Sequence, residues 1–329
     1  MVKGISVIIP NFNGLHLFPD TLYTVEEALG FTQKPFEIIV VDDCSTDGSV
    51  KYLQENYPVV IIISNPSNSG FSVTANRGIQ SAKYDKVLLL NSDVKLTPDY
   101  FLTQFKYFNQ ADTFGVMGRI INWDDDHIQD GAKYPSLQGG KIKTSKNYLL
   151  RDKQAMADGL YSMYLSGANA FIDKEKFLAI GGFNKLFSPF YVEDFELSLR
   201  AWRLGFKCYY NHESICKHKT STTIKSSSRK KFVEIIYNRN KFFLHAIHLS
   251  GNIKLLWYVQ LFAEAFLKLL TGKWSYIQSL KLLFNASGKI KKSRLDFDTS
   301  AARLHSNKSV KEVADFILGS IEGKEKIIF

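Results

Sequence analysis

The stretch EIIVVDDCSTDGS, residues 37–49, carries the pattern that decides the fold. Residues 37–41 are mostly apolar and β-branched, which is typical of a parallel strand buried on both faces of its sheet. The run ends abruptly at Asp42 and Asp43, and the polar residues 45–47 that follow can cap the N-terminus of a helix. This stretch therefore predicts a buried strand, an acidic turn and a helix in direct succession.

The same alternation extends to both sides of this stretch. The sequence predicts strands at 5–9, 37–41, 59–64 and 86–90, and helices at 15–29, 49–56 and 73–82. Strands that alternate with helices indicate an α/β fold with a doubly wound, mostly parallel sheet. Such sheets bind ligands beyond the carboxyl ends of their strands. Those ends read Pro-Asn-Phe-Asn at 10–13, Asp-Asp at 42–43 and Asn-Ser-Asp at 91–93.

Composition and missing motifs exclude several classes of protein. The chain has 329 residues, 45% hydrophobic and 22% charged, which excludes a mainly disordered chain, a collagen and a coiled-coil rod. Three cysteines are too few for a disulfide framework and favour a reducing compartment. The sequence shows neither a signal peptide nor a run of 18 uncharged apolar residues. A dinucleotide fingerprint after the first strand and a P-loop are also missing.

Positive charge is concentrated in one segment of the chain. The formal net charge is +10, yet residues 217–294 hold 16 Lys and Arg against 2 Asp and Glu, a net of +14, which leaves −4 for the rest. We therefore expect an α/β domain at 1–225 and a basic helical region at 226–329, with the boundary marked by the serines at 226–228. Helices are predicted in the second region at 229–249, 253–270 and 273–287.

The basic region is predicted to meet an anionic membrane surface through residues 253–294. On the helix expected at 253–270, Gln260, Glu264 and Lys268 form one narrow polar stripe on a largely apolar surface. Aromatic and aliphatic side chains beside lysines suit a helix that lies in a membrane interface. A helical cap on the first domain and a homo-oligomer interface are the alternatives. Nucleic-acid binding lacks any recognised motif and is not expected.

Acidic residues follow two of the predicted strands. Asp93, with Asn91 two residues before it, offers half of a site for a hard divalent cation, which takes its other ligands from water or substrate phosphates. A strand-to-helix cap is the alternative interpretation. The adjacent carboxylates of Asp42 and Asp43 repel each other unless a cation, a hydrogen-bond donor or water relieves them. For this pair the alternative is a capped loop.

Glu193 and Asp194 open a predicted helix that ends before Gly205. The aromatic stretch at 187–191 would shield a carboxylate from water, and such shielding raises a pKa toward that of a useful general base. The alternative is a purely structural role, because acids early in a helix and arginines late in it both suit the helix dipole.

In their order along residues 4–220, these motifs resemble the family 2 glycosyltransferases of the GT-A fold, and among them rhamnosyltransferase-like enzymes of bacterial surface glycans. The motifs are SVIIPNFNG at 6–14, EIIVVDDCSTDGS at 37–49, NSGFSVTANRGI at 68–79, VLLLNSDV at 87–94, and GGFN at 181–184 followed by YVEDFELSLRAWRLGF at 191–206. Each motif alone is weak, but five in the right order are not expected by chance.

The resemblance implies a role for each matching residue. The nucleotide-sugar site would comprise Pro10, Asn11, Asn13, Asp42, Asp43, Gly70, Asn76, Asn91 and Ser92. Asp42 would hydrogen-bond the ring imide of a uracil or thymine, Gly70 would let the backbone approach the nucleotide, and Asn76 would order its loop.

The resemblance also implies a metal ion and a catalytic base. Asp93 would bind Mg²⁺ or Mn²⁺, and Asp194 would deprotonate the acceptor hydroxyl, with Glu193 orienting the base or the acceptor. His218 lies where many relatives carry a metal-binding histidine; the alternative is a solvated histidine in a basic loop. Asn91 replaces the usual first acid of the D-x-D motif, so we expect a lower metal affinity.

The function implied is inverting transfer of a sugar from a UDP- or dTDP-type donor to a hydroxyl of a glycan or lipid-linked acceptor. We expect a cytoplasmic enzyme of bacterial cell-surface polysaccharide synthesis, peripheral at the inner face of the membrane. A single base opposite the leaving group gives one displacement and hence inversion. A nucleotidyltransferase of similar fold and a non-catalytic carbohydrate-binding or scaffold homologue are the alternatives. Residues 122–160 are predicted to form a loop or a flexible insertion of the kind that determines specificity. Glu196 is predicted to serve packing or capping.

Overall fold

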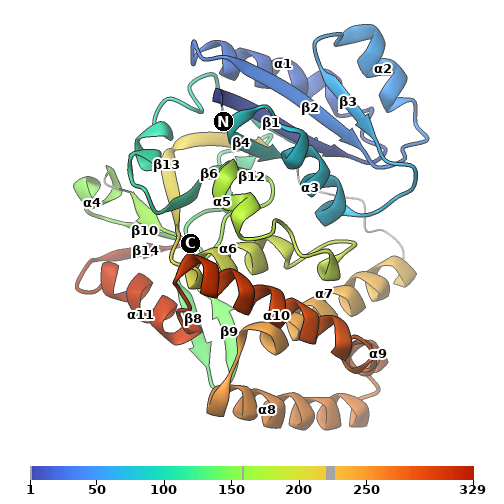
Figure 1. The fold of residues 1–329 in the computed structure, drawn as a ribbon, viewed down its shortest axis with the longest axis vertical. Coiled ribbons are helices and arrows are strands. Elements are labelled where there is room, and N and C mark those ends of the chain that lie inside the picture. Colours follow the sequence, from blue (N-terminus) through green and yellow to red (C-terminus); the bar gives the residue numbers. More distant parts are fainter. Residues whose placement is uncertain (1, 158, 220–226) are drawn as a thin grey trace.

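A computed structural model describes residues 2–157, 159–219 and 227–329 of the chain (Figure 1). Its strands are β1 (Val2–Asn11), β2 (Phe36–Asp42), β3 (Ile61–Ser64), β4 (Tyr84–Leu90), β5 (Val94–Leu96), β6 (Thr113–Asn122), β7 (Ile128–Asp130), β8 (Pro135–Gln138), β9 (Lys141–Thr144), β10 (Tyr148–Leu150), β11 (Leu160–Tyr161), β12 (Asn169–Asp173), β13 (Lys207–His218) and β14 (Lys326–Ile328). Its α-helices are α1 (Phe18–Gly30), α2 (Ser49–Asn56), α3 (Phe71–Ser81), α4 (Lys153–Ala157), α5 (Lys174–Ala179), α6 (Glu193–Arg203), α7 (Ser227–His248), α8 (Gly251–Leu270), α9 (Trp274–Asn285), α10 (Ser287–Leu304) and α11 (Val310–Ser320).

One large mixed sheet organises the first two thirds of the chain. Its strand order is β11-β13-β6-β12-β4-β1-β2-β3, with β5 paired to β13 and β7 to β6. The pairs β1–β2, β1–β4 and β2–β3 are parallel, whereas β12 runs antiparallel to both of its neighbours. The predicted α/β fold with a doubly wound sheet and a C-terminal helical extension is confirmed, with antiparallel pairs added in the second half of the sheet.

The central strand β1 is buried on both faces, as its continuous apolar run predicts. Ile5, Val7 and Ile9 lie in one hydrophobic cluster together with side chains of α1. Ile8 lies in a second cluster on the opposite face, together with Ala75 of α3. Because both faces are covered, residues 4–9 of β1 are all buried, and this burial stabilises a mainly apolar strand.

Strand register aligns the polar strand ends at one edge of this sheet. Asn11, the last residue of β1, pairs with Asp42, the last residue of β2. The long strand β13 then reaches the same region from the second half of the chain, because its last residue His218 pairs with Val94 of β5, just after the turn at the end of β4. Residues far apart in the sequence are therefore gathered beside the carboxyl ends of β1, β2 and β4.

The prediction of a loop at 122–160 is wrong. This segment contains the short strands β7 to β10 and the helix α4. Strands β8 and β9 form a hairpin with Gly139 and Gly140 in the turn. A side chain at Gly140 would overlap the backbone nitrogen of Trp257, so the turn packs directly against α8. The hairpin is stabilised by this distant helix, and the local Gly-rich composition therefore gave no sign of strands.

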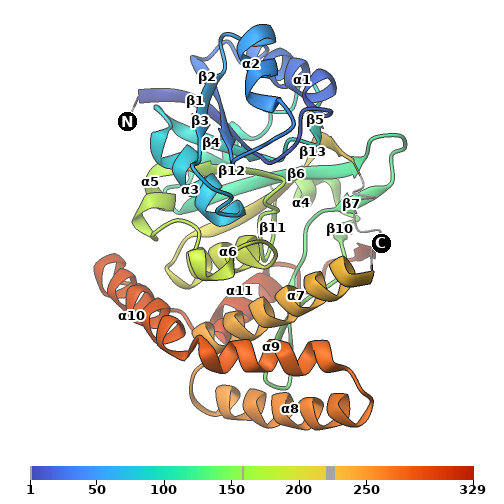
Figure 2. The same cartoon turned by 90° about the vertical axis from the view of Figure 1, so that its right-hand side faces the viewer.

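The C-terminal helices stack on the face of the sheet that carries α6 (Figure 2). Helices α7, α8 and α9 match the predicted helices within a few residues, whereas α10 and α11 were not predicted. One hydrophobic cluster includes Ala75 of α3, Leu197 of α6, Phe243 of α7 and Trp257 of α8.

The predicted domain boundary at 225/226 lies outside the described residues, and the division into two domains stays a prediction. No helix among the described residues has the length and hydropathy that crossing a membrane requires.

Gly78 of α3 offers a test of the packing between this helix and the sheet. A Cβ at Gly78 would overlap Ile8 Cγ2 and lie 2.8 Å from Val41 Cγ2, so Gly78→Ala should destabilise the fold by about 1–3 kcal/mol through overpacking. Gly30→Ala is the matched control, since a Cβ there meets no atom within 4 Å and alanine favours a helix. Urea denaturation of the two variants checks this, and equal stability of the two would contradict it.

Candidate active site

Hydrogen bonds lock the turn after β1 to the turn after β2. The Asn11 side-chain nitrogen donates to Asp42 Oδ1 at 2.9 Å and to Ser45 Oγ at 3.2 Å. The backbone nitrogen of Ser45 donates to Asp42 Oδ2 at 2.9 Å, and that of Asn13 donates to Ser45 Oγ at 2.8 Å. Thr46 N in turn donates to Asn13 Oδ1. Three of the predicted nucleotide residues, Asn11, Asn13 and Asp42, thus form one network, next to Pro10 at the end of β1.

Phe12 is a site residue that the sequence analysis missed. Its neighbours Asn11 and Asn13 turn their side chains into the network, and the Phe12 ring is left 53% exposed at the same edge. A large exposed ring beside a polar turn is a surface on which a planar base can stack. The signal was present in the motif Pro-Asn-Phe-Asn, because an aromatic residue in an otherwise polar turn has no core to fill.

Asp43 holds the loop that precedes α3. Its carboxylate accepts hydrogen bonds from the backbone nitrogens of Ser69 and Gly70, at 2.9 and 2.8 Å, and from the Asn65 side chain at 2.7 Å. Gly70 has a left-handed φ of +81°, and a side chain there would lie 2.9 Å from the Cα of Pro189. The close approach at Gly70 in this structure is therefore one to the segment before α6.

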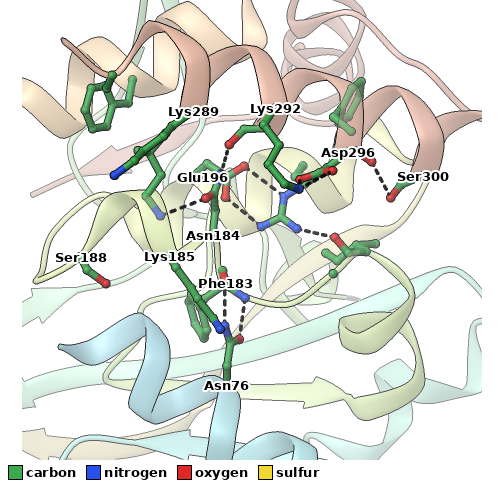
Figure 3. A pocket seen from close by; sticks show the side chains of 18 of the residues that line it. Asn76, Phe183, Asn184, Lys185, Ser188, Glu196, Lys289, Lys292, Asp296 and Ser300 are labelled. Atoms are coloured by element: carbon green, nitrogen blue, oxygen red, sulfur yellow. Dashed lines mark hydrogen bonds and ion pairs between the residues drawn. The ribbon is translucent and has the colours of Figure 1, made fainter. Parts of the chain in front are cut away.

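Asn76 connects α3 to the turn at 181–184. Its side-chain nitrogen donates to the Phe183 carbonyl and its oxygen accepts from the Phe183 nitrogen, both at 2.8 Å (Figure 3). Such a two-way amide bond fixes the turn relative to the helix. Gly70 and Asn76 thus lie in contact with the segment 181–189 that leads to Glu193 and Asp194.

Asp93 and His218 lie side by side, with 3.4 Å between Asp93 Oδ1 and His218 Nε2. The other ring nitrogen, His218 Nδ1, is 2.8 Å from Gln129 Oε1, and the Gln129 amide nitrogen donates to the His218 carbonyl. We therefore assign the proton to Nδ1, which turns the lone pair of Nε2 toward the Asp93 carboxylate. Two electron-rich atoms facing each other suit a divalent cation, and a histidine held by an outer partner is typical of metal ligands.

The backbone around Asp93 is held rigidly. Its carbonyl accepts from Trp123 Nε1 at 3.0 Å and from the Lys219 nitrogen at 3.1 Å. Asn91 and Ser92 lie in the same turn, half-buried, and Ser92 Oγ faces Gly14 of the first motif. No group of three or more His, Cys, Asp or Glu that could hold a metal occurs among residues 2–157, 159–219 and 227–329. A cation at Asp93 and His218 would need further ligands from water or a bound phosphate.

Glu193 and Asp194 form the first turn of α6 in an apolar setting. Asp194 accepts hydrogen bonds from the Gly167 nitrogen at 3.2 Å and the Phe195 nitrogen at 2.7 Å. Glu193 is 7% exposed and its Oε2 lacks a hydrogen-bond partner. Burial, and next the charge of Asp194, raises the pKa of Glu193 to about 8, and burial also raises the pKa of Asp194. Neither carboxyl lies in its usual environment, which is typical of acid–base sites.

The backbone before α6 is strained. Tyr191 and Val192 both have left-handed φ angles, +73° and +71°, although neither is glycine. A β-branched residue such as Val192 is unfavourable in this conformation, by about 1–3 kcal/mol, and surrounding contacts must hold it there. Strained backbone next to a pair of carboxyls with raised pKa values is a second sign of a functional loop.

Asn240 of α7 supplies those contacts. Its side chain is fully buried, and its nitrogen donates to the carbonyls of Phe187 at 2.7 Å, Phe190 at 3.0 Å and Tyr191 at 2.8 Å. Its oxygen accepts from Arg239 Nε and Nη2. The sequence analysis missed Asn240, although a signal existed. Asn240 falls in line with buried apolar residues at 236, 243 and 247 of the same helix, and a buried amide needs partners.

Glu196, predicted to serve packing or capping, lies in a buried ion-pair network. Its carboxylate accepts from Arg200 Nε and Nη2 at 3.0 and 2.8 Å, and His248 Nε2 of α7 lies 3.1 Å from Oε1. These partners outweigh the effect of burial, so the pKa of Glu196 is lowered to about 2, whereas burial lowers that of His248 to about 4. The network fixes α6 to α7, and its arginine pairs with Glu196 and not with Asp194, two residues away.

A cavity of about 950 Å³ lies between the turn at 181–188 and α10, lined by Asn76, Lys185, Lys289 and Lys292 among others (Figure 3). Lys292 is paired with Asp296 at 2.7 Å. Neither Asp93 nor Asp194 lines this cavity. Of the predicted nucleotide-sugar residues, Asn76 lines this cavity, whereas those in the turns after β1, β2 and β4 do not.

Comparisons with known proteins find sequences and folds similar to this chain. The profile described as "Glycosyl transferase family 2" matches residues 6–181, more than half of the chain. TuaG of Bacillus subtilis (strain 168), named as a teichuronic acid biosynthesis glycosyltransferase, is 32% identical over 31% of this chain and 41% of its own length. The O-antigen chain rhamnosyltransferase WbaN of Salmonella anatum is 22% identical over 70% of this chain and 71% of its own.

A solved structure shares the fold over nearly the whole chain. GalNAc-T7, crystallised with UDP, GalNAc and Mn²⁺, superposes with a TM-score of 0.68 and 18% sequence identity, covering 97% of this chain and 57% of its own. At this identity the likeness shows the fold alone. The chain thus covers less than half of TuaG and a little over half of GalNAc-T7.

The carboxyl of Glu193 should make stability depend on pH. Because its pKa is about 8 in the folded chain and near 4.5 when unfolded, the wild type loses stability as pH rises from 4.5 through 8. Glu193→Gln lacks this loss, so its stability relative to the wild type should rise by a few kcal/mol between about pH 4 and pH 9. Urea denaturation across this range measures the difference.

Glu196→Gln is the control, with the opposite sign. The Glu196 carboxylate stabilises the fold above pH 4.5, and that stability is lost as pH falls toward 2, so this variant should be destabilised at neutral pH and approach the wild type in acid. A pH-independent difference between Glu193→Gln and the wild type would contradict the assignment.

Proposed function

The chain belongs to glycosyltransferase family 2, and from this membership and the site geometry we propose that it transfers a sugar from a nucleotide-diphosphate donor to an acceptor hydroxyl with inversion. The donor is of UDP or dTDP type, and the acceptor is a hydroxyl of a glycan or lipid-linked glycan. The single observation that carries the proposal is the contact between Asp93 and His218, two residues that β5 and β13 bring together at the carboxyl edge of the sheet.

Asp93 and His218 would hold Mg²⁺ or Mn²⁺, with the donor diphosphate completing its ligands. The ion supplies charge that offsets the negative charge of the departing diphosphate. Gln129 holds the His218 ring through Nδ1, and Trp123 holds the Asp93 backbone, so both ligands are fixed before the donor binds. Asn91 contributes only a neutral oxygen, which fits a site that relies on phosphate oxygens.

The nucleobase would lie over the linked turns after β1 and β2. Asp42 accepts hydrogen bonds from Asn11 and Ser45, and a carboxylate with about four acceptor directions retains capacity for the imide N–H of uracil or thymine. The exposed Phe12 ring offers a face for stacking of the base. Asp43 would contribute indirectly, because its hydrogen bonds hold the loop at 65–70 in position beside the nucleotide.

Asp194 would be the general base, opposite the leaving group. Its proton-accepting oxygen takes the hydroxyl proton as the acceptor oxygen attacks the anomeric carbon, and the bond from that carbon to the diphosphate oxygen breaks. A raised pKa strengthens Asp194 as a base. Glu193 stays protonated at neutral pH, so its carboxyl can donate a hydrogen bond to the acceptor or to Asp194. One displacement inverts the anomeric configuration.

The biological setting proposed is synthesis of a bacterial cell-surface polysaccharide, at the cytoplasmic face of the membrane. The names of TuaG and WbaN, which refer to teichuronic acid and O-antigen chains, support this setting. The sugar would be a hexose or deoxyhexose.

Nucleotide binding and sugar transfer can be separated by three variants. UDP or dTDP with Mn²⁺ should raise the melting temperature of the wild type, and Asp93→Ala and His218→Ala should lose the part that depends on Mn²⁺. Asp194→Asn should keep the full shift, because it leaves the donor site intact, and lose sugar transfer by about 10²-fold or more. Thermal shift and a transfer assay over a panel of nucleotide sugars are the measurements. Full transfer by Asp194→Asn would refute the base, and no shift with either nucleotide would refute the donor site.

Asn240 should affect the rate and not donor binding. Asn240→Leu keeps the branching of the side chain but removes the donors to three carbonyls of residues 187–191, the loop before the proposed base. We therefore expect kcat to fall by about tenfold or more while the donor KM changes by less than about twofold. Asn238→Ala on the same helix, which lines a cavity beside α8, is the matched control and should keep wild-type kinetics. Initial rates with the donor found in the panel decide this. A rise in donor KM at constant kcat would argue against a role in positioning the base.

A further inference from the structure

Helix α8 presents an apolar face to the outside. Within residues 253–270 every residue classed as exposed is apolar, namely Leu255, Leu256, Val259, Phe262, Ala263, Phe266, Leu267, Leu269 and Leu270. Six of these side chains are more than half exposed, at 51–68%, namely Leu255, Val259, Phe262, Phe266, Leu267 and Leu270. Each of them has another member three or four residues away, so together they form one broad face along the helix. We call these nine residues the α8 face.

Three polar residues of α8, Lys254, Gln260 and Glu264, bond to neighbouring parts of the fold. Lys254 Nζ donates to the Ala246 carbonyl at 3.2 Å, whereas Asn252 in the first turn is exposed. Gln260 Oε1 accepts from the Gly140 nitrogen at 2.9 Å, and Glu264 pairs with Lys141 and accepts from Tyr276 Oη at 3.0 Å. The polar stripe seen in the sequence is thus used to bind the β8–β9 hairpin and α9. A helix exposed to water normally has its polar side outward. This inverted arrangement means that the α8 face is built for an apolar environment.

The patch continues beyond α8 and lies at one end of the molecule. Trp274 and Phe284 of α9 are 58% and 49% exposed, and the Phe284 ring stacks on that of Phe262 with centroids 6.3 Å apart. In both ribbon views α8 forms the layer farthest from the sheet (Figures 1 and 2). The face is therefore open to a large, flat partner. Contiguous apolar surfaces of this kind mark interaction sites.

We propose that the α8 face lies on the surface of an anionic lipid bilayer. The segment 217–294 that contains it carries a net charge of +14, and its exposed lysines include Lys273, Lys281 and Lys289. Such a segment is complementary to anionic headgroups, to which each nearby lysine or arginine adds about 1 kcal/mol. A second copy of this chain would bring an equally basic segment against the first, which is unfavourable. The helix lies in the interface plane, with its apolar face in the acyl boundary.

The proposal goes beyond the proposed function and does not rest on it. The test uses the full chain and sedimentation with vesicles of phosphatidylcholine alone or with phosphatidylglycerol added. The wild type should bind the anionic vesicles and be released as salt is raised. Phe262→Glu with Phe266→Glu should weaken binding by at least about tenfold. The change removes two rings that would enter the bilayer and adds two negative charges that the anionic headgroups repel. The same double change at exposed apolar positions elsewhere, Val59→Glu with Leu102→Glu, is the matched control and should bind as the wild type does.

Three results would overturn the proposal. The first is a wild-type chain that binds neither vesicle, and the second is equal binding by the Phe262/Phe266 variant. The third is a dimer seen by light scattering that this variant dissociates, which would assign the face to a second copy. Circular dichroism checks that both variants fold. The UDP-induced thermal shift without vesicles should be unchanged in the variant, so a failure of membrane docking is distinguishable from a failure of the donor site.

Discussion

The parallel pairing of β1 with β2 and β4 is the constraint on which the rest of the structure depends. It requires three strands that are apolar on both faces, and it places their polar ends side by side at one edge of the sheet. The register that sets Asn11 opposite Asp42 then allows the two turns to hydrogen-bond each other. The elements from the second half of the chain that reach this edge, including the end of β13 with His218, lie beside the polar surface that these strand ends form.

Sequence reasoning succeeded where structure depends on local pattern. The strands at 5–9, 37–41 and 86–90 and the helices at 49–56 and 253–270 follow from apolar runs and periodicity that tertiary contacts did not override. It failed where a segment is stabilised by distant partners. The β8–β9 hairpin is stabilised by contacts with α8, far along the chain. Asn240 forms its hydrogen bonds with a loop some fifty residues earlier in the sequence. Such contacts leave only indirect traces, such as a buried amide in an apolar stripe.

Helix α6 shows how environment, and not residue type, decides the chemistry of a carboxyl. Glu193 and Glu196 are one turn apart, yet the pKa of the first is raised to about 8 and that of the second lowered to about 2. The difference arises because Glu196 faces Arg200 and His248, whereas Glu193 is buried without a cation. Glu196 thereby anchors α6 to α7, whereas Glu193 and Asp194 are the pair proposed for proton transfer, and a motif of three acids alone cannot assign the two roles.

The amide of Asn240 also bears on how proteins of this kind can diversify. A C-terminal extension that only covers a catalytic domain can be exchanged freely between relatives, in the manner of a module. Here the extension supplies the hydrogen bonds that hold the strained residues before α6 in place. A recombinant chain that joins the α/β region to another extension would contain the strained loop before α6 without the hydrogen bonds from Asn240. The sequences of the α/β region and of the C-terminal helices are therefore expected to co-vary in evolution. The hydrogen bonds from Asn240 to the carbonyls of residues 187–191 are the contact that couples them.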